Sequence, residues 1–219
     1  MSDTSNKYGY VGAENIPVQS FGNNAGIFSA NDIYDLTRED KWTNYGQLEL
    51  IETQIHSTDV SEVDFTNIKA DIYDVHFMTL NNIVSSSDAG LDCRLSDDNG
   101  TTFESGSYDY DIQFVQTSGT SNGETRSTSG NAFTRLGALG ANANEQGNGY
   151  MYFYNLGDST KYSFATHQSS SWNFNAHLVM YFGSLVYHQT VSMNALRVFP
   201  TAGSLTDFEI SLYGIKSYE

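Results

Sequence analysis

Two carboxylates, Asp109 and Asp111, stand two positions apart and alternate with Tyr108 and Tyr110. In a β-strand, both carboxylates project from one face, about 7 Å apart, and both rings project from the other. Such a pair suits a Ca²⁺ ion or the acid and base of glycoside hydrolysis. Calcium takes about 6–8 oxygen ligands, however, and no loop carries the dense Asp and Asn spacing that supplies them. A solvated acidic face is therefore the favoured interpretation, and calcium binding stays an open alternative.

The other reactive side chains show no catalytic or metal-binding spacing. The sequence has no G-x-S-x-G elbow, and its histidines never fall at the short intervals of a zinc site. Cys93 is the only cysteine, which excludes a disulfide framework, and its predicted strand position indicates a buried, inert thiol. We therefore expect no enzymatic activity, no cofactor and no metal. The five histidines are His56, His76, His167, His177 and His188.

Aromatic residues are abundant, with 15 Tyr and 13 Phe. In the segment 150–154, the alternation places three tyrosines on one face of a strand and a methionine and a phenylalanine on the other. The tyrosine face suits a partner interface or stacking on sugars, although aromatic filling of a sandwich core explains it equally well. Trp172, in a polar segment, is the best single candidate for a glycan contact, with plugging of a sandwich end as the alternative. A glycan-binding module would use loops at 118–131, 140–149 and 168–177.

The segment from Ser96 to Phe103 matches the S-x-D-x-G-x-T-[WF] pattern known as the Asp-box. Asp98 is expected to accept hydrogen bonds from turn amides, and Gly100 is expected to supply a positive φ angle. Phe103 would then return to the core. The motif predicts a structural hairpin between the strands on either side of it, and it indicates no activity.

The charge balance limits the classes of partner. Lys and Arg total 10 against 26 Asp and Glu, for a formal net charge of −16. Such a field repels phosphate backbones and anionic membranes, so we expect neither nucleic acid nor membrane as a partner. No apolar run approaches the length of a membrane helix, and the first residues lack the pattern of a signal peptide.

Residues 46–219 predict an all-β domain. Short apolar and aromatic runs are separated by Gly, Asn, Asp and Ser, which favours a jelly-roll-like antiparallel β-sandwich of about ten strands. In the first run, the apolar phase slips between Leu50 and Ile51, which predicts a β-bulge. The expected strands are Gln47–Ile55, Ile72–Leu80, Leu91–Leu95, Tyr108–Thr117, Phe133–Leu139, Tyr150–Asn155, Lys161–His167, Leu178–Phe182, Ala195–Phe199 and Phe208–Gly214.

Residues 1–45 read as an extended arm that carries one short helix, for which Asn31 is the expected N-cap. The segment has too little apolar content to form a core of its own, so we expect it to dock on a partner. The predicted docking anchors are its large apolar side chains: Phe21, Ile27, Phe28, Tyr34, Leu36 and Trp42.

The phrase from Gly26 to Trp42, with the closing segment Ile210–Lys216, resembles sequences of virion structural proteins of tailed bacteriophages of marine and cyanobacterial type. The resemblance implies a virion location and other virion proteins, capsid or tail subunits, as partners, with a homo-oligomer in the particle. A compact chain without fibre repeats favours a capsid decoration or cement protein that docks through its arm. The alternative is a tail-associated or receptor-binding module that recognises a host surface glycan.

Overall fold

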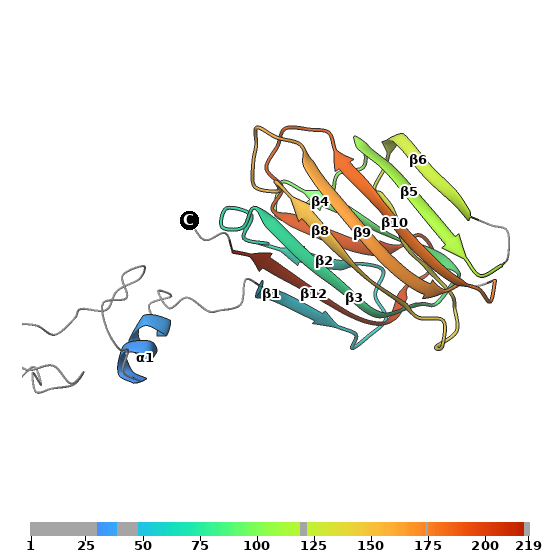
Figure 1. The fold of residues 1–219 in the computed structure, drawn as a ribbon, viewed down its shortest axis with the longest axis horizontal. Helices are drawn as coiled ribbons and strands as arrows, with labels where there is room; N and C mark the ends of the chain where they lie inside the picture. Colours follow the sequence, from blue (N-terminus) through green and yellow to red (C-terminus); the bar gives the residue numbers. More distant parts are fainter. Residues whose placement is uncertain (1–29, 39–47, 119–121, 174, 217–219) are drawn as a thin grey trace, which may run out of the picture. The chain divides into compact units, whose positions relative to one another are not determined.

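A computed structural model describes residues 30–38, 48–118, 122–173 and 175–216. The chain divides into two units, Met1–Gly46 and Gln47–Glu219. The first unit contains helix α1 (Ala30–Arg38), and the second contains twelve strands in two antiparallel sheets (Figure 1). The predicted all-β sandwich is confirmed, with two strands more than the ten expected.

The larger sheet has eight strands in the order β1-β12-β3-β8-β9-β10-β5-β6. They are β1 (Leu48–Ile55), β12 (Leu205–Ile215), β3 (Val75–Ser85), β8 (Gly147–Tyr154), β9 (Ser163–Trp172), β10 (Leu178–Tyr187), β5 (Tyr108–Gln116) and β6 (Asn122–Gly130). The smaller sheet has the order β2-β11-β4-β7. Its strands are β2 (Val63–Thr66), β11 (Ala195–Pro200), β4 (Ala89–Ser96) and β7 (Phe133–Leu139).

Eight of the twelve strands follow the wiring of a jelly roll. When β5, β6, β9 and β10 are set aside, the first strand pairs with the last, the second with the next to last, and so on inward to β4 and β7. The hairpin β5-β6 is inserted between β4 and β7, and β9-β10 is inserted between β8 and β11. Because β10 pairs with β5, the insertions join each other and extend the larger sheet from four strands to eight (Figure 1).

The core lies between the sheets and follows the predicted alternation. Leu91, Cys93 and Leu95 on β4 are buried, as are Ile210 and Leu212 on β12. The predicted bulge is also confirmed, because the pairing of β1 with β12 shifts between Leu50 and Glu52.

Strand β6 lies inside the segment 118–131 that was expected to be a loop, so that prediction was wrong. It has no apolar side chain to signal a strand. Instead, two rings of β5 lie against its glycines: a Cβ atom at Gly123 would fall 2.5 Å from the ring of Phe114, and one at Gly130 would fall 2.7 Å from the ring of Tyr110. The glycines leave the space that these rings occupy, and this packing allows β6 to pair with β5 at the edge of the larger sheet.

The Asp-box forms the predicted turn. The Thr102 amide donates to Asp98 Oδ1 at 2.9 Å, the Thr102 hydroxyl donates to Asp98 Oδ2 at 2.8 Å, and Gly100 has a φ of 84°. The amide of Gly100 donates to the buried Ser96 Oγ at 2.9 Å. Two details differ from the prediction. The turn joins β4 and β5, which lie in different sheets, so it is not a hairpin, and the half-buried Phe103 packs under the Arg197 guanidinium at 4.1 Å.

Helix α1 starts at Ala30, so Asn31 lies inside the helix and is not its N-cap. Tyr34 has 66% of its surface exposed, Ile33 is also exposed, and Leu36 belongs to the helix. The other predicted anchors, Phe21, Ile27, Phe28 and Trp42, lie outside the described residues.

Candidate binding site

The outer faces of the two sheets differ in chemistry. On the smaller sheet, Arg197 forms a two-pronged ion pair with Asp64, and the Arg94 guanidinium lies 4.9 Å from the ring of Phe199. Both guanidinium groups therefore have partners within the protein, Asp64 for Arg197 and the Asn131 carbonyl for Arg94. The outer face of the larger sheet, here called the open face, carries exposed rings, hydroxyls and amides together with the carboxylates of Asp109 and Asp111, and it is the better candidate for binding.

A cluster of rings occupies the β12, β3 and β8 part of the open face. The ring of Phe77 lies 4.7 Å from Tyr152, 6.0 Å from Tyr150 and 6.1 Å from Tyr213, measured between ring centroids. Tyr154 stacks on Tyr152 at 6.5 Å. The predicted alternation along β8 is therefore confirmed, since the intervening Met151 and Phe153 are fully buried.

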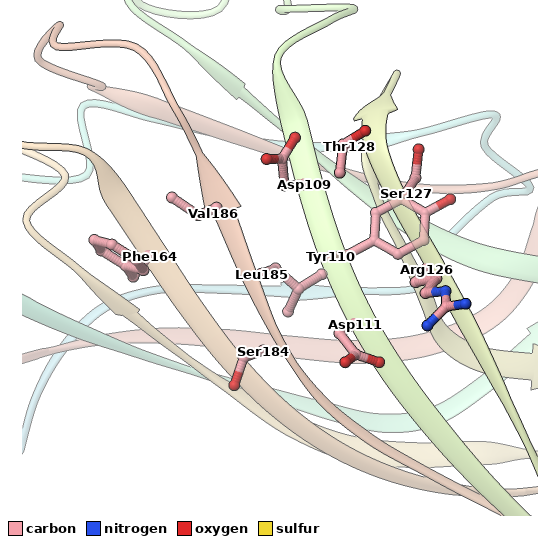
Figure 2. Close-up of a pocket in the computed structure, with 10 residues that line it drawn as sticks. All are labelled: Asp109, Tyr110, Asp111, Arg126, Ser127, Thr128, Phe164, Ser184, Leu185 and Val186. Carbon is pink, nitrogen blue, oxygen red and sulfur yellow. The ribbon is translucent and has the colours of Figure 1, made fainter.

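A groove of about 580 Å³ lies at the β9, β10, β5 and β6 part of the same sheet (Figure 2). This volume falls within the range of about 300–1,000 Å³ that is common for small-molecule sites. Every lining residue lies on the four inserted strands. The lining consists of Asp109, Tyr110, Asp111, Arg126, Ser127, Thr128, Phe164, Ser184, Leu185 and Val186.

Strand register brings the two predicted carboxylates into this groove. On β10, Val186 is paired with Asp109 and Ser184 with Asp111, and Phe164 of β9 is paired with Val186 on its other side. In Figure 2, Asp109 and Asp111 leave β5 toward β10, whereas Tyr110 leaves it toward β6. The groove therefore has an apolar part at β9 and β10 and a row of carboxylates at β5.

The charges around the groove are unevenly paired. Arg126 lies 3.3 Å from Glu124, and His188 Nδ1 lies 3.1 Å from Asp109 Oδ1 without the geometry of a hydrogen bond. Asp111 is exposed and has no ion pair among the described residues. The groove is thus acidic, with Asp111 as an exposed carboxylate.

Trp172 was expected in a loop, and that prediction was wrong, because Trp172 is the last residue of β9. It has 43% of its surface exposed, and it pairs with the exposed Leu178 on β10. Eight positions separate it from Phe164, which corresponds to about 27 Å along the strand. The predicted glycan loops are correspondingly shorter, because β8 begins at Gly147 and β9 includes residues 168–172. Trp172 and the groove are therefore separate places on the open face.

Two of the five histidines, His76 and His167, and the cysteine Cys93 lie in the core. Burial lowers the pKa of His167 to about 4 and also lowers the pKa of His76, so both imidazoles are neutral at pH 7. Burial raises the pKa of the Cys93 thiol. Within the described ranges, no group of three or more His, Cys, Asp or Glu side chains is placed to hold a metal ion. Asp109 and Asp111 share a face, as predicted, and the His188 imidazole lies beside Asp109, but among the described residues these side chains do not form a group that could hold a metal ion.

The sequence pointed to Asp109 and Asp111 but not to Ser184, Val186 or Phe164, which complete the groove. Those residues lie in ordinary strand patterns, and only the pairings of β10 with β5 and with β9 bring them together. Among the described residues, no helix has the length and apolar character that crossing a membrane requires.

Comparisons with protein-family models, curated proteins and solved structures found no match to this chain.

Proposed function

We propose that this chain is a non-enzymatic structural protein of a tailed-phage virion. It docks through residues 1–45 and presents the jelly-roll domain outward, as a capsid decoration protein does. The observation that carries the proposal is the phrase from Gly26 to Trp42, which resembles virion proteins. Tyr34 lies within that phrase and exposes two thirds of its surface, which is compatible with a ring that a partner covers.

The charge of the chain supports an outward position for the sandwich. With a formal net charge of −16 on each chain, neighbouring copies repel one another, which limits association except where a specific contact overcomes the repulsion. We propose that residues 1–45, which carry the predicted apolar anchors, make this specific contact.

Mass spectrometry of purified phage particles from an infected culture that produces the chain tests this proposal. We expect the protein in the particles, at a copy number that matches the capsid lattice. A copy number that matches the tail would move the protein to the tail-associated alternative. Absence from the particles would contradict a virion role altogether.

Carbohydrate binding is the second candidate function, and the open face favours it. Phe164, Trp172 and Phe182 are each partly exposed there, close to hydroxyl and amide side chains of the same strands. Exposed rings beside hydrogen-bonding groups suit sugars, which have apolar C–H faces and polar edges. Retention of intact host polysaccharide on the immobilised protein, without release of reducing ends, is the expected result. Cleavage of the polysaccharide would contradict a non-enzymatic role.

A further inference from the structure

We propose that the groove lined by β5, β9 and β10 binds a neutral saccharide of two linked rings, with one ring on Phe164 and the hydroxyls of the other on Asp109 and Asp111. This inference rests on the second candidate function, carbohydrate binding. It places the site about 27 Å from Trp172, the residue that the sequence alone favours.

The apolar part of the groove can hold the face of a sugar ring. Phe164 has 46% of its surface exposed, and Val186, its partner across the β9-β10 pair, continues the apolar surface toward β5. The C–H groups on one face of a pyranose pack against such a surface and shield it from water. A charged or extended polar ligand would leave Phe164 and Val186 uncovered.

The polar part supplies acceptors in the arrangement that a polyol needs. Asp109 and Asp111 project from the same face of β5, and the Ser184 hydroxyl lies on β10 opposite Asp111. Each ionised carboxylate accepts hydrogen bonds at two oxygens, and sugar hydroxyls can donate to both. Since His188 lies against Oδ1 of Asp109, the second oxygen of this carboxylate is the one assigned to the ligand.

The size and charge of the groove select against other ligands. Phe164 and the two aspartates lie two strand spacings apart, about 10 Å, which is wider than one pyranose and suits two linked rings. The carboxylates oppose phosphate, sulfate and uronate groups, and the nearest cation, Arg126, is already matched by Glu124. A neutral polyol satisfies the two carboxylates without bringing a further negative charge.

The test begins with the full-length protein on an array of neutral oligosaccharides. The strongest disaccharide among glucose-, galactose-, mannose- and N-acetylglucosamine-based compounds is then titrated by calorimetry or NMR up to about 10 mM, which covers millimolar affinities. Phe164→Ala and Asp111→Ala are expected to raise the Kd by about tenfold or more. Phe199→Ala, which changes a ring on the smaller sheet, is the control and is expected to leave the Kd unchanged, and Trp172→Ala distinguishes the groove from a site at Trp172.

Each outcome separates the groove from the broader function. Loss of binding in Trp172→Ala, with binding kept in Phe164→Ala and Asp111→Ala, would overturn the groove and leave carbohydrate binding in place. Binding of choline chloride with no response to any neutral sugar would overturn the proposal in favour of a cation site. An array with no neutral oligosaccharide bound would overturn the groove, and only a further failure to retain host polysaccharide would overturn the second candidate function, without bearing on a virion role. Retained circular dichroism and thermal melting of each variant show that a lost signal is not misfolding.

Discussion

Arg197 on β11 and Asp64 on β2 meet in a two-pronged ion pair, with Nε to Oδ1 and Nη2 to Oδ2 both at 2.7 Å. The same guanidinium covers the ring of Phe103, which follows the Asp-box turn. One side chain therefore connects an edge strand of the smaller sheet to the loop that crosses to the larger sheet. Its planar, forked shape is what allows both contacts at once.

Replacement of Arg197 by Lys tests this connection, because the variant keeps the charge and loses the fork. We expect a loss of about 1–2 kcal/mol in the free energy of unfolding, measured by urea denaturation. Arg126→Lys is the matched control, since Arg126 is an exposed partner of Glu124, and it is expected to change stability very little. Equal effects of the two substitutions would show that charge alone accounts for the contribution of Arg197.

The Asp-box turn depends on the buried hydroxyl of Ser96, which accepts the amide of Gly100. Ser96→Ala leaves that amide without its acceptor, so we expect a loss of about 1–3 kcal/mol. Asp98→Ala is also expected to lower the melting temperature, because Thr102 loses its acceptor. Ser170→Ala, on an exposed position of β9, serves as the control. Unchanged unfolding of the Ser96 and Asp98 variants would mean that these hydrogen bonds do not hold the turn.

The buried imidazole of His167 is expected to make stability depend on pH. Its pKa is about 4 in the folded protein because of burial, against about 6.5 in the unfolded chain. Between these values the unfolded chain binds a proton that the folded chain does not, so stability falls as pH falls. The contribution is fully present above about pH 6.5, and about 3 kcal/mol is lost by about pH 4.

Urea unfolding of the protein between pH 7.5 and 5 measures this dependence. The slope of stability against pH is expected to be smaller in His167→Gln than in the unchanged protein. The interpretation fails if His167→Gln and the unchanged protein lose stability equally as the pH falls. His76 is buried too, and its lowered pKa acts in the same direction.

Removal of residues 1–46 is expected to leave a folded domain, since all twelve strands and their pairings lie in the unit Gln47–Glu219. The β signal in circular dichroism should persist, with a melting temperature within about 4 °C of the full-length value, equivalent to about 1 kcal/mol. Loss of cooperative melting would show that the N-terminal segment belongs to the core. A folded but truncated protein that no longer attaches to particles would support docking through the arm.

The sequence was sufficient to predict most strands in which one face is apolar and the other polar. Leu91, Cys93 and Leu95 are an example, and even the bulge after Leu50 was visible as a slip in phase. The four-residue β2 was missed despite the alternation of Val63 and Phe65 with polar residues. Strand β6 escaped prediction because its inward positions are filled by rings of β5 lying over Gly123 and Gly130. The second half of β9 escaped for a related reason: its buried positions are serines, so burial there is not accompanied by apolar residues.

The candidate site could be predicted only in part, for a different physical reason. The placement of Asp109 and Asp111 on one face follows from the period of a strand, which is a local property. Their proximity to Ser184 follows from the register of β5 against β10, about 70 positions away, and no local pattern encodes that register.

The confinement of the groove to the two inserted hairpins has a consequence for how such a protein can diversify. The eight strands that close the roll contribute none of the groove's lining residues, so changes in ligand preference need not disturb the pairings on which the fold depends. Variable function is more often carried by loops on a rigid scaffold. In this protein the groove lies on paired strands, and the pairing of β9 with β8 joins these inserted strands to the jelly roll. Their outward side chains can therefore change while the strands continue to present them on a rigid surface. Related chains are accordingly expected to differ most at outward positions of β5, β9 and β10, and least along β12, β3, β11 and β4.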